Sequence, residues 1–170
     1  MHFEEMAQSQ ILDTHFRVNV GVIIINSKHQ VLAFERKKID GAWQFPQGGL
    51  DPNDKSLIAA AERELEEETA IIAKTDLKLI AQYKHWLAYE IPAKAREKKK
   101  HRMARGQVQK WFLYQILDDK MPIELAKAKD KEFKNHQWMN MEDLVAGMVE
   151  FKKPVYKKLQ KWVKKQMKKR

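Results

Sequence analysis

The sequence predicts an α/β protein, a three-layer α/β/α sandwich around a mixed β-sheet. Stretches of strand composition lie both before and after one central helical stretch, and further helical segments follow late in the chain. No internal repeat or low-complexity linker divides it. With 170 residues, of which 44% are hydrophobic, the chain suits one core, so we expect a single domain over residues 1–170.

The first half of the sheet is predicted from composition. Phe16–Asn26 (FRVNVGVIIIN) is rich in β-branched residues and indicates a central, buried strand. A turn at Asn26–Lys28 leads into a second strand, Gln30–Arg36, which makes a hairpin. Trp43–Phe45 is a short strand that ends at Pro46.

The central helix is predicted at Leu57–Thr69. This stretch contains no Gly or Pro and has three consecutive alanines. Asp54 and Ser56 stand where they could cap its first turn.

Three carboxylates, Glu64, Glu67 and Glu68, share one face of this helix at positions i, i+3 and i+4. Each like-charged pair weakens an isolated helix by about 0.2–0.5 kcal/mol. Arg63 can pair with Glu67 at i+4, but one guanidinium cannot neutralise the whole group. A solvated acidic face is the plain alternative. The Gly48-Gly49 pair before the helix favours a site for hard divalent cations, Mg²⁺ or Mn²⁺.

The second half of the chain predicts further strands and two late helices. The expected strands are Leu77–Ile91, Gln109–Ile116 and Phe133–Met139. A basic loop, Ala93–Arg105, separates the first two of them. The expected helices are Met141–Met148, capped by Asn140, and a basic C-terminal helix at about 154–168. In that helix Pro154 fits the first turn, and an apolar stripe opposes the lysines.

The positive charge is concentrated at the C-terminus. Residues 151–170 hold nine lysines, one arginine and no acidic residue, which by themselves equal the net charge of +10. Together with the basic loop Ala93–Arg105, this tail predicts an anionic polymer or a polyphosphate as partner.

The stretch from Gly48 to Ile71 resembles the Nudix box, in which a glycine and a loop precede Arg-Glu-apolar-x-Glu-Glu. That core is complete as Arg63-Glu64-Leu65-Glu66-Glu67-Glu68. The resemblance implies a Nudix-type sandwich and metal-dependent hydrolysis of a pyrophosphate bond. Two positions depart from the pattern. Lys55 stands at the site of the box's first glutamate, in a loop one residue longer, and Ala70 replaces a helix-ending glycine. An alanine that keeps positive φ costs about 1 kcal/mol, so we expect a remodelled helix end.

A wider likeness extends from about Phe16 to Tyr156. It resembles the Nudix branch that contains bacterial RNA pyrophosphohydrolase and the plant-type diadenosine tetraphosphate hydrolases. The matching segments are FRVNVG, WQFPQGG, WLAYEIP, GQVQKWFL, EFKNHQW and VEFKKPVY.

The likeness implies roles for individual residues. Catalysis would involve Arg63, Glu64, Glu67, Glu68 and Glu132. The metal ligands would be Glu64, Glu67, Glu68, Glu132 and the carbonyl of Gly48. The substrate would contact Arg17, Lys37 and Gln47 with its phosphates, and Phe151, Val149 and Tyr89 with its first base. The alternative for Phe151, Tyr89 and Trp86 is ordinary core packing, which is favoured for Trp86 and disfavoured for Phe151, because lysines follow Phe151 directly.

Three functions remain open. The first is RNA 5′-pyrophosphohydrolase, favoured by the basic loop and tail. The second is asymmetric hydrolysis of dinucleoside tetraphosphates. The third is an inactive nucleotide- or RNA-binding Nudix module, supported by Lys55 and Ala70 alone. The absence of cysteine fits a cytoplasmic location, and no apolar run is long enough for a membrane span.

Overall fold

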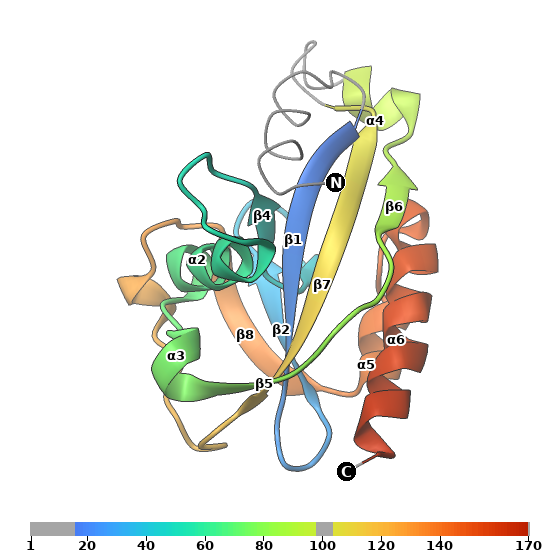
Figure 1. Ribbon diagram of the computed structural model, residues 1–170. Coiled ribbons are helices and arrows are strands. Elements are labelled where there is room, and N and C mark those ends of the chain that lie inside the picture. The colour runs from blue at the N-terminus through green and yellow to red at the C-terminus, as the bar shows by residue number, and fades with distance from the viewer. Residues whose placement is uncertain (1–15, 98–103, 170) are drawn as a thin grey trace.

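The computed structural model describes residues 16–97 and 104–169 and has the predicted α/β/α architecture (Figure 1). Its mixed sheet has eight strands in the path β3-β2-β1-β7-β5, with β4 beside β1, β6 beside β7 and β8 beside β2. The strands are β1 (Phe16–Ile25), β2 (Val31–Arg36), β3 (Trp43–Gln44), β4 (Gln47–Gly49), β5 (Leu77–Gln82), β6 (Leu87–Glu90), β7 (Gly106–Ile116) and β8 (Phe133–Met139). The helices are α2 (Leu57–Thr69), α3 (Ala73–Asp76), α4 (Ala93–Glu97), α5 (Met141–Ala146) and α6 (Lys153–Met167), with short 3₁₀ turns at Leu125–Lys127 and Glu150–Lys152.

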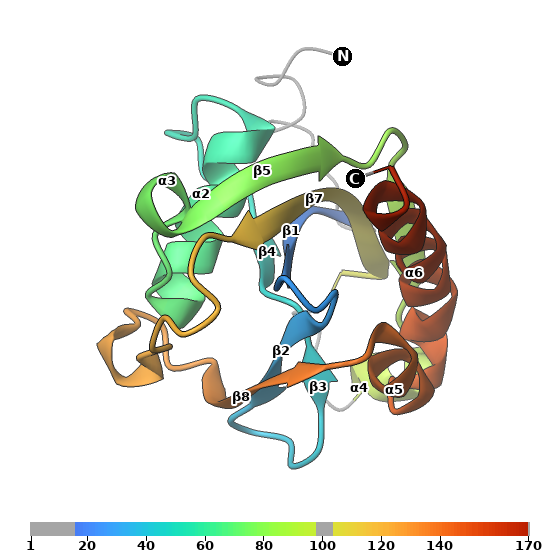
Figure 2. The ribbon, with the colours of Figure 1, turned by 90° about the horizontal axis from the view of Figure 1, so that it is seen from below.

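The parallel pair β1 and β7 forms the centre of the sheet, in register from Phe16 opposite Gly106 to Ile25 opposite Gln115. Alternate side chains of β1 enter opposite cores, as the two-residue period of a strand requires. Ile23 and Ile25 pack in the core beneath α5 and α6, and their neighbours along the strand pack beneath α2. Both faces of the sheet are therefore covered, which the end-on view makes plain (Figure 2).

The central helix α2 lies where the sequence predicted it. The Ser56 side chain accepts a hydrogen bond of 3.1 Å from the backbone N–H of Ala59 and so caps the helix. Asp54 does not cap it and binds Arg63 instead. The expectation of a remodelled helix end is wrong, because Ala70 keeps the left-handed conformation with φ 62°.

Three local features differ from the prediction. The expected strand Leu77–Ile91 is divided into β5 and β6, which pair with opposite ends of β7. The Ala93–Arg105 segment is not all loop, since it begins with α4, and its residues 98–103 lie outside the described part of the chain. Strand β4 and helix α3 were not predicted; both are too short to produce a periodic pattern.

The C-terminal helix α6 docks on the sheet through its apolar stripe. Val155, Leu159 and Val163 are buried, and the Trp162 ring lies 5.2 Å from that of Tyr83. Pro154 occupies the first turn, as expected. Among the described helices, none is long and apolar enough to cross a bilayer.

Candidate active site

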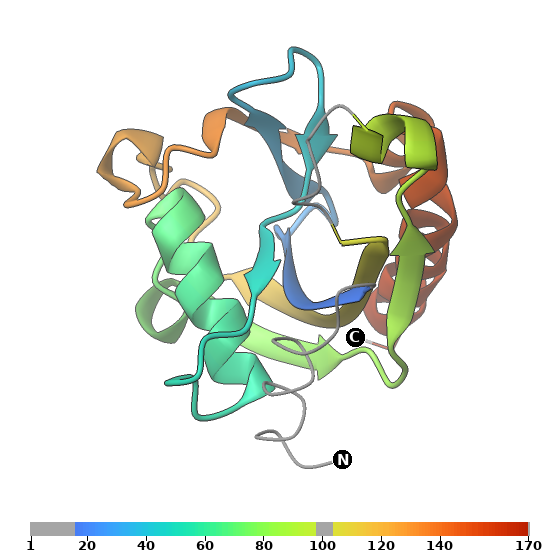
Figure 3. The same cartoon turned by 90° about the horizontal axis from the view of Figure 1, so that it is seen from above.

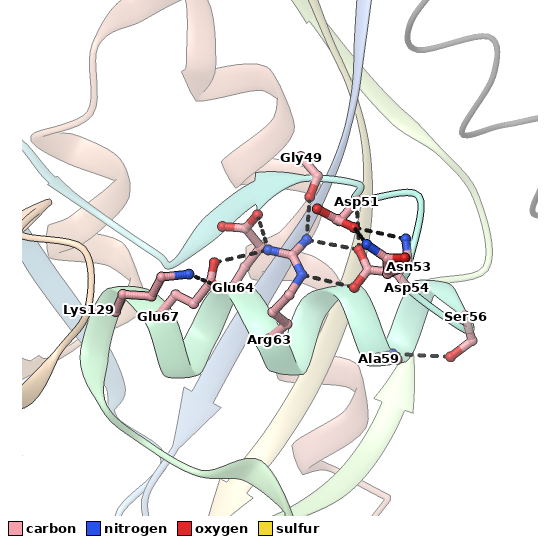
Figure 4. A network of polar contacts seen from close by, with 10 residues as sticks. All are labelled: Gly49, Asp51, Asn53, Asp54, Ser56, Ala59, Arg63, Glu64, Glu67 and Lys129. Atoms are coloured by element: carbon pink, nitrogen blue, oxygen red, sulfur yellow. Dashed lines mark hydrogen bonds and ion pairs between the residues drawn. The ribbon is translucent and has the colours of Figure 1, made fainter.

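Arg63 joins the middle of α2 to the loop that precedes the helix (Figure 4). Its Nε and Nη2 each donate a 2.9 Å hydrogen bond to Asp54, and Nη2 also donates to the carbonyl of Gly49. Nη1 donates to Glu64 at 2.9 Å and to Glu67 at 3.1 Å, so the predicted i,i+4 pair is present. The arginine thereby fixes both the loop and two carboxylates of the helix. Its carboxylate partner in the loop is Asp54. The next residue, Lys55, which departs from the Nudix box pattern, is exposed.

The backbone at Gly48 passes directly against a carboxylate. A Cβ at Gly48 would lie 1.9 Å from Oε2 of Glu64. Strand β4, which carries Gly48, is held opposite Val20 of β1. The backbone at Gly48, whose carbonyl is an expected metal ligand, thus lies against the Glu64 side chain. A cation bound by both groups would need this proximity.

A cavity of about 550 Å³ opens at this end of the sheet, where β4 lies between α2 on one side and α4 and α6 on the other (Figure 3). Three carboxylates line it: Glu64 and Glu68 from α2, and Glu132 from the segment before β8. Residues far apart in sequence therefore meet in one pocket, as the wider likeness implied for Glu132.

Burial shapes the chemistry of the two helix carboxylates. Glu68 is 8% exposed and accepts a 3.1 Å hydrogen bond from the backbone N–H of Gln47. Burial, with the negative charges of Glu64 and Glu132 nearby, raises the pKa of Glu68 to about 9. Burial also raises the pKa of Glu64, against the opposing influence of Arg63. A cation among these groups would offset their cost of ionisation, and their oxygens suit a hard divalent ion.

Besides Glu64, which binds Arg63, two more of the expected ligands bind protein cations. Glu67 accepts a 2.8 Å hydrogen bond from Lys129, which with Arg63 holds the pKa of Glu67 below its usual value. Oε1 of Glu132 accepts a 3.1 Å hydrogen bond from Nε of Arg36. Within the described residues, no three Asp, Glu or His side chains are arranged ready to hold a metal ion. Glu67 and Glu132 would have to rotate to join Glu64 and Glu68.

Basic and aromatic side chains line the rest of the cavity. Arg17, Arg36 and Lys152 supply positive charge, and burial, with Arg36 nearby, lowers the pKa of Lys152 to about 8. The rings of Tyr89 and Phe151 lie 5.7 Å apart. The pocket therefore offers cations for phosphate oxygens and an aromatic pair for a base.

A buried amide connects three amides that line the cavity, Asn19, Gln47 and Gln107. The buried Gln109 on β7 donates to Gln47 at 2.8 Å, to Gln107 at 3.2 Å and to Asn19 at 3.3 Å. Gln107 in turn accepts a 2.8 Å hydrogen bond from the hydroxyl of Tyr89. These bonds hold Gln47 and Tyr89 in place.

The structure gathers most of the predicted site residues but leaves four outside the cavity, namely Arg63, Glu67, Lys37 and Val149. Lys37 is exposed, and only its backbone N–H approaches Glu132, donating to the carbonyl at 2.8 Å. Val149 is 48% exposed and does not line the pocket. Sequence reasoning missed Arg36 and Lys152. Each adjoins a predicted residue, Lys37 or Phe151, and that adjacency was the available signal.

The NUDIX domain family matches residues 15–159 of this chain. The chain therefore belongs to the Nudix family of pyrophosphohydrolases, whose members generally require a divalent cation. It is 39% identical over 146 residues to an RNA pyrophosphohydrolase of Pasteurella multocida, covering 86% of this chain and 72% of that protein. It is 38% identical over 149 residues to the chloroplastic Nudix hydrolase 26 of Arabidopsis thaliana, covering 85% of this chain and 67% of that one.

Solved structures share the fold at lower identity. The dihydroneopterin triphosphate pyrophosphohydrolase of E. coli aligns with a TM-score of 0.65 and 20% identity, covering 85% of this chain and 95% of that chain. An Ap4A hydrolase of C. elegans aligns with a TM-score of 0.61 and 20% identity, covering 86% and 96%. These likenesses confirm the predicted Nudix-type fold.

Proposed function

We propose that this chain hydrolyses a pyrophosphate bond at the 5′ end of RNA and converts a 5′-triphosphate into a 5′-monophosphate. The observation that carries the proposal is that one cavity joins three carboxylates, three basic side chains and an aromatic pair. The relatives named RNA pyrophosphohydrolase, at 36–39% identity, support this choice of substrate.

The carboxylates would serve the reacting end of the substrate. Glu64, Glu67, Glu68 and the Gly48 carbonyl would hold the cation, for which we propose Mg²⁺. When bound, such an ion lowers the pKa of water and neutralises charge on the phosphates. Glu132 would be either a further ligand or the general base that accepts the proton of the attacking water. Arg63 would act as a positioning residue, because it contacts Glu64 and Glu67 from outside the cavity.

The other residues would bind and orient the substrate. Arg17, Arg36, Gln47 and Lys152 would contact phosphate oxygens. Phe151 and Tyr89 would stack on the first base, a contact worth about 1–3 kcal/mol that accepts any base. Lys37 and Val149, which the family likeness also assigned to the substrate, lie outside the cavity and would act only at its rim.

Asymmetric hydrolysis of dinucleoside tetraphosphates is the second candidate, since Phe151 could stack on a nucleoside whose polyphosphate reaches Glu64 and Glu68. The test is to compare hydrolysis of 5′-triphosphorylated RNA, 5′-diphosphorylated RNA and diadenosine tetraphosphate at matched magnesium and salt. Preference for the RNA substrates supports the proposal. Preference for diadenosine tetraphosphate would replace it with the second candidate, and no hydrolysis of any substrate would leave the inactive binding module.

Glu68→Gln is the decisive variant in this assay. It should lower turnover more than about 100-fold, beyond the loss typical of outer-shell residues at metal sites. The melting temperature should not fall, because a neutral amide of the same shape replaces a carboxylate that is costly to ionise in its buried position. Glu66→Gln is the matched control, since Glu66 is exposed on the same helix. Equal turnover in the Glu68 and Glu66 variants would remove the assigned site.

A further inference from the structure

Helix α6 presents a row of lysines to solvent from its middle toward its C-terminal end. Its buried stripe, Val155, Leu159 and Val163, fixes the rotation of the helix against the sheet. Lys158, Lys161 and Lys165 are exposed. Their spacing of i, i+3 and i+7 places them on one face. We name these three residues the lysine face.

The lysine face lacks acidic neighbours in the described part of the chain. Helix α6 contains no Asp or Glu. Two other lysines of this helix are neutralised, Lys164 by Glu142 of α5 and Lys153 by Glu150. Among the ion pairs of the described residues, none involves the lysine face. Its charges repel one another and leave a positive field in solution, which suits an anionic partner.

The position of the helix connects this face to the active-site cavity. Phe151 and Lys152 line the cavity, and α6 begins at the next residue. From there the helix runs down the side of the sheet to the C-terminus (Figure 1). Its 15 residues span about 22 Å at 1.5 Å per residue. A chain whose first base stacks on Phe151, with its polyphosphate toward Glu64 and Glu68, would leave the cavity beside the start of this helix.

We propose that the lysine face binds the phosphate backbone of the RNA substrate downstream of its first nucleotides. This inference rests on the proposed function and adds a second contact region to it. A bilayer surface is the less suitable partner, because a membrane-binding amphipathic helix inserts its apolar face. In α6 that face is already buried against the sheet.

The test removes the three charges together as Lys158→Gln, Lys161→Gln and Lys165→Gln. Glutamine has nearly the helix propensity of lysine, so α6 should persist. The matched control is Lys74→Gln, Lys78→Gln and Lys120→Gln. These exposed lysines lie on α3, near the start of β5, and in the turn after Leu117, whose backbone N–H donates to the carbonyl of Asp76 in α3. Equilibrium binding and hydrolysis are measured for a triphosphorylated RNA that spans the helix and for a triphosphorylated dinucleotide.

For the long RNA, the slope of log binding constant against log salt concentration should be smaller by about 2 in the lysine-face variant. Each phosphate contact on a single strand contributes about 0.7 to this slope, and the variant removes three lysines. Between about 50 and 200 mM salt, the wild-type protein should then lose about 20-fold more affinity than the variant. Hydrolysis of the dinucleotide should be equal in both, and the control variant should retain the wild-type salt slope.

Three results would overturn the inference. The control variant could lose the same slope, which would indicate bulk charge. The dinucleotide could be affected as strongly as the long RNA, which would indicate a structural helix. RNA binding could be unchanged while binding to anionic phospholipid vesicles is lost, which would indicate a membrane. Failure of the wild-type protein to hydrolyse the triphosphorylated dinucleotide would instead reject the proposed function, and RNA binding would still decide the role of the lysine face.

Discussion

Replacing Gly48 by alanine should lower the activity strongly and change the stability of the fold little. The added Cβ would lie 1.9 Å from Oε2 of Glu64, whereas ordinary contacts begin at 3.4 Å, so the carboxylate must move by about 1.5 Å. The backbone cannot yield easily, because Gly48 pairs with Val20 in the sheet. A misplacement of about 1 Å in a catalytic group costs about 100-fold, so we expect at least that loss in kcat.

The fold should tolerate the same change. Gly48 does not have positive φ, so alanine at this position should stabilise the folded state by about 0.4–1 kcal/mol relative to the unfolded chain. Loss of the Arg63–Glu64 ion pair offsets this by about 0–1 kcal/mol, since Arg63 is 28% exposed. The net change in the free energy of unfolding should therefore stay within about 1 kcal/mol, or about 4 °C in melting temperature.

The assay combines thermal melting with hydrolysis of triphosphorylated RNA at saturating magnesium. Gly147→Ala is the control, because its Cβ would meet nothing closer than 3.7 Å and its φ is −82°. The control should match the wild-type protein in both measurements. If Gly48→Ala kept kcat within a few-fold of wild type, the position of the Glu64 carboxylate would not matter and the assigned metal site would be wrong.

Three further predictions follow from single contacts. Ala70→Gly should raise the melting temperature by about 2–4 °C, because it relieves about 1 kcal/mol of left-handed strain; no rise would show that the strain is absent. Phe151→Ala should raise KM by about 5–150-fold through lost stacking while melting changes little, and a large fall in melting temperature would instead identify Phe151 as a core residue. Arg36→Gln should raise KM more than Lys37→Gln, because only Arg36 lines the cavity, and the reverse order would restore Lys37 to the phosphate channel.

Several helices and strands of this protein could be predicted from the local preferences of their residues. The β-branched run of β1, the alanine-rich helix α2 with its Ser56 cap, and the apolar stripe of α6 all lie where they were predicted. Each contains several residues that repeat one local preference, so the pattern is strong. The carboxylate face of α2 was readable for the same reason, because helical spacing alone brings Glu64 and Glu68 together.

Features that depend on residues distant in sequence could not be predicted from the sequence. Ala70 keeps an unfavourable conformation that local propensity argues against, and its chain neighbours Thr69 and Ile71 are both buried in the fold. Leu77–Ile91 looked like one strand, and only its pairing with β7 divides it into two.

The sequence by itself determined the longer helices and the central strand, the family and the acidic helix, since these depend on residue order and spacing along one segment. Tertiary structure decided which side chains share the cavity. It selected Arg36 in place of Lys37, brought Glu132 toward Glu68 and placed the partly buried Lys152 over the Tyr89 ring. The physical reason is that a side chain's exposure and charge environment are set by the strands and helices packed around it, and sequence spacing carries no information about those neighbours.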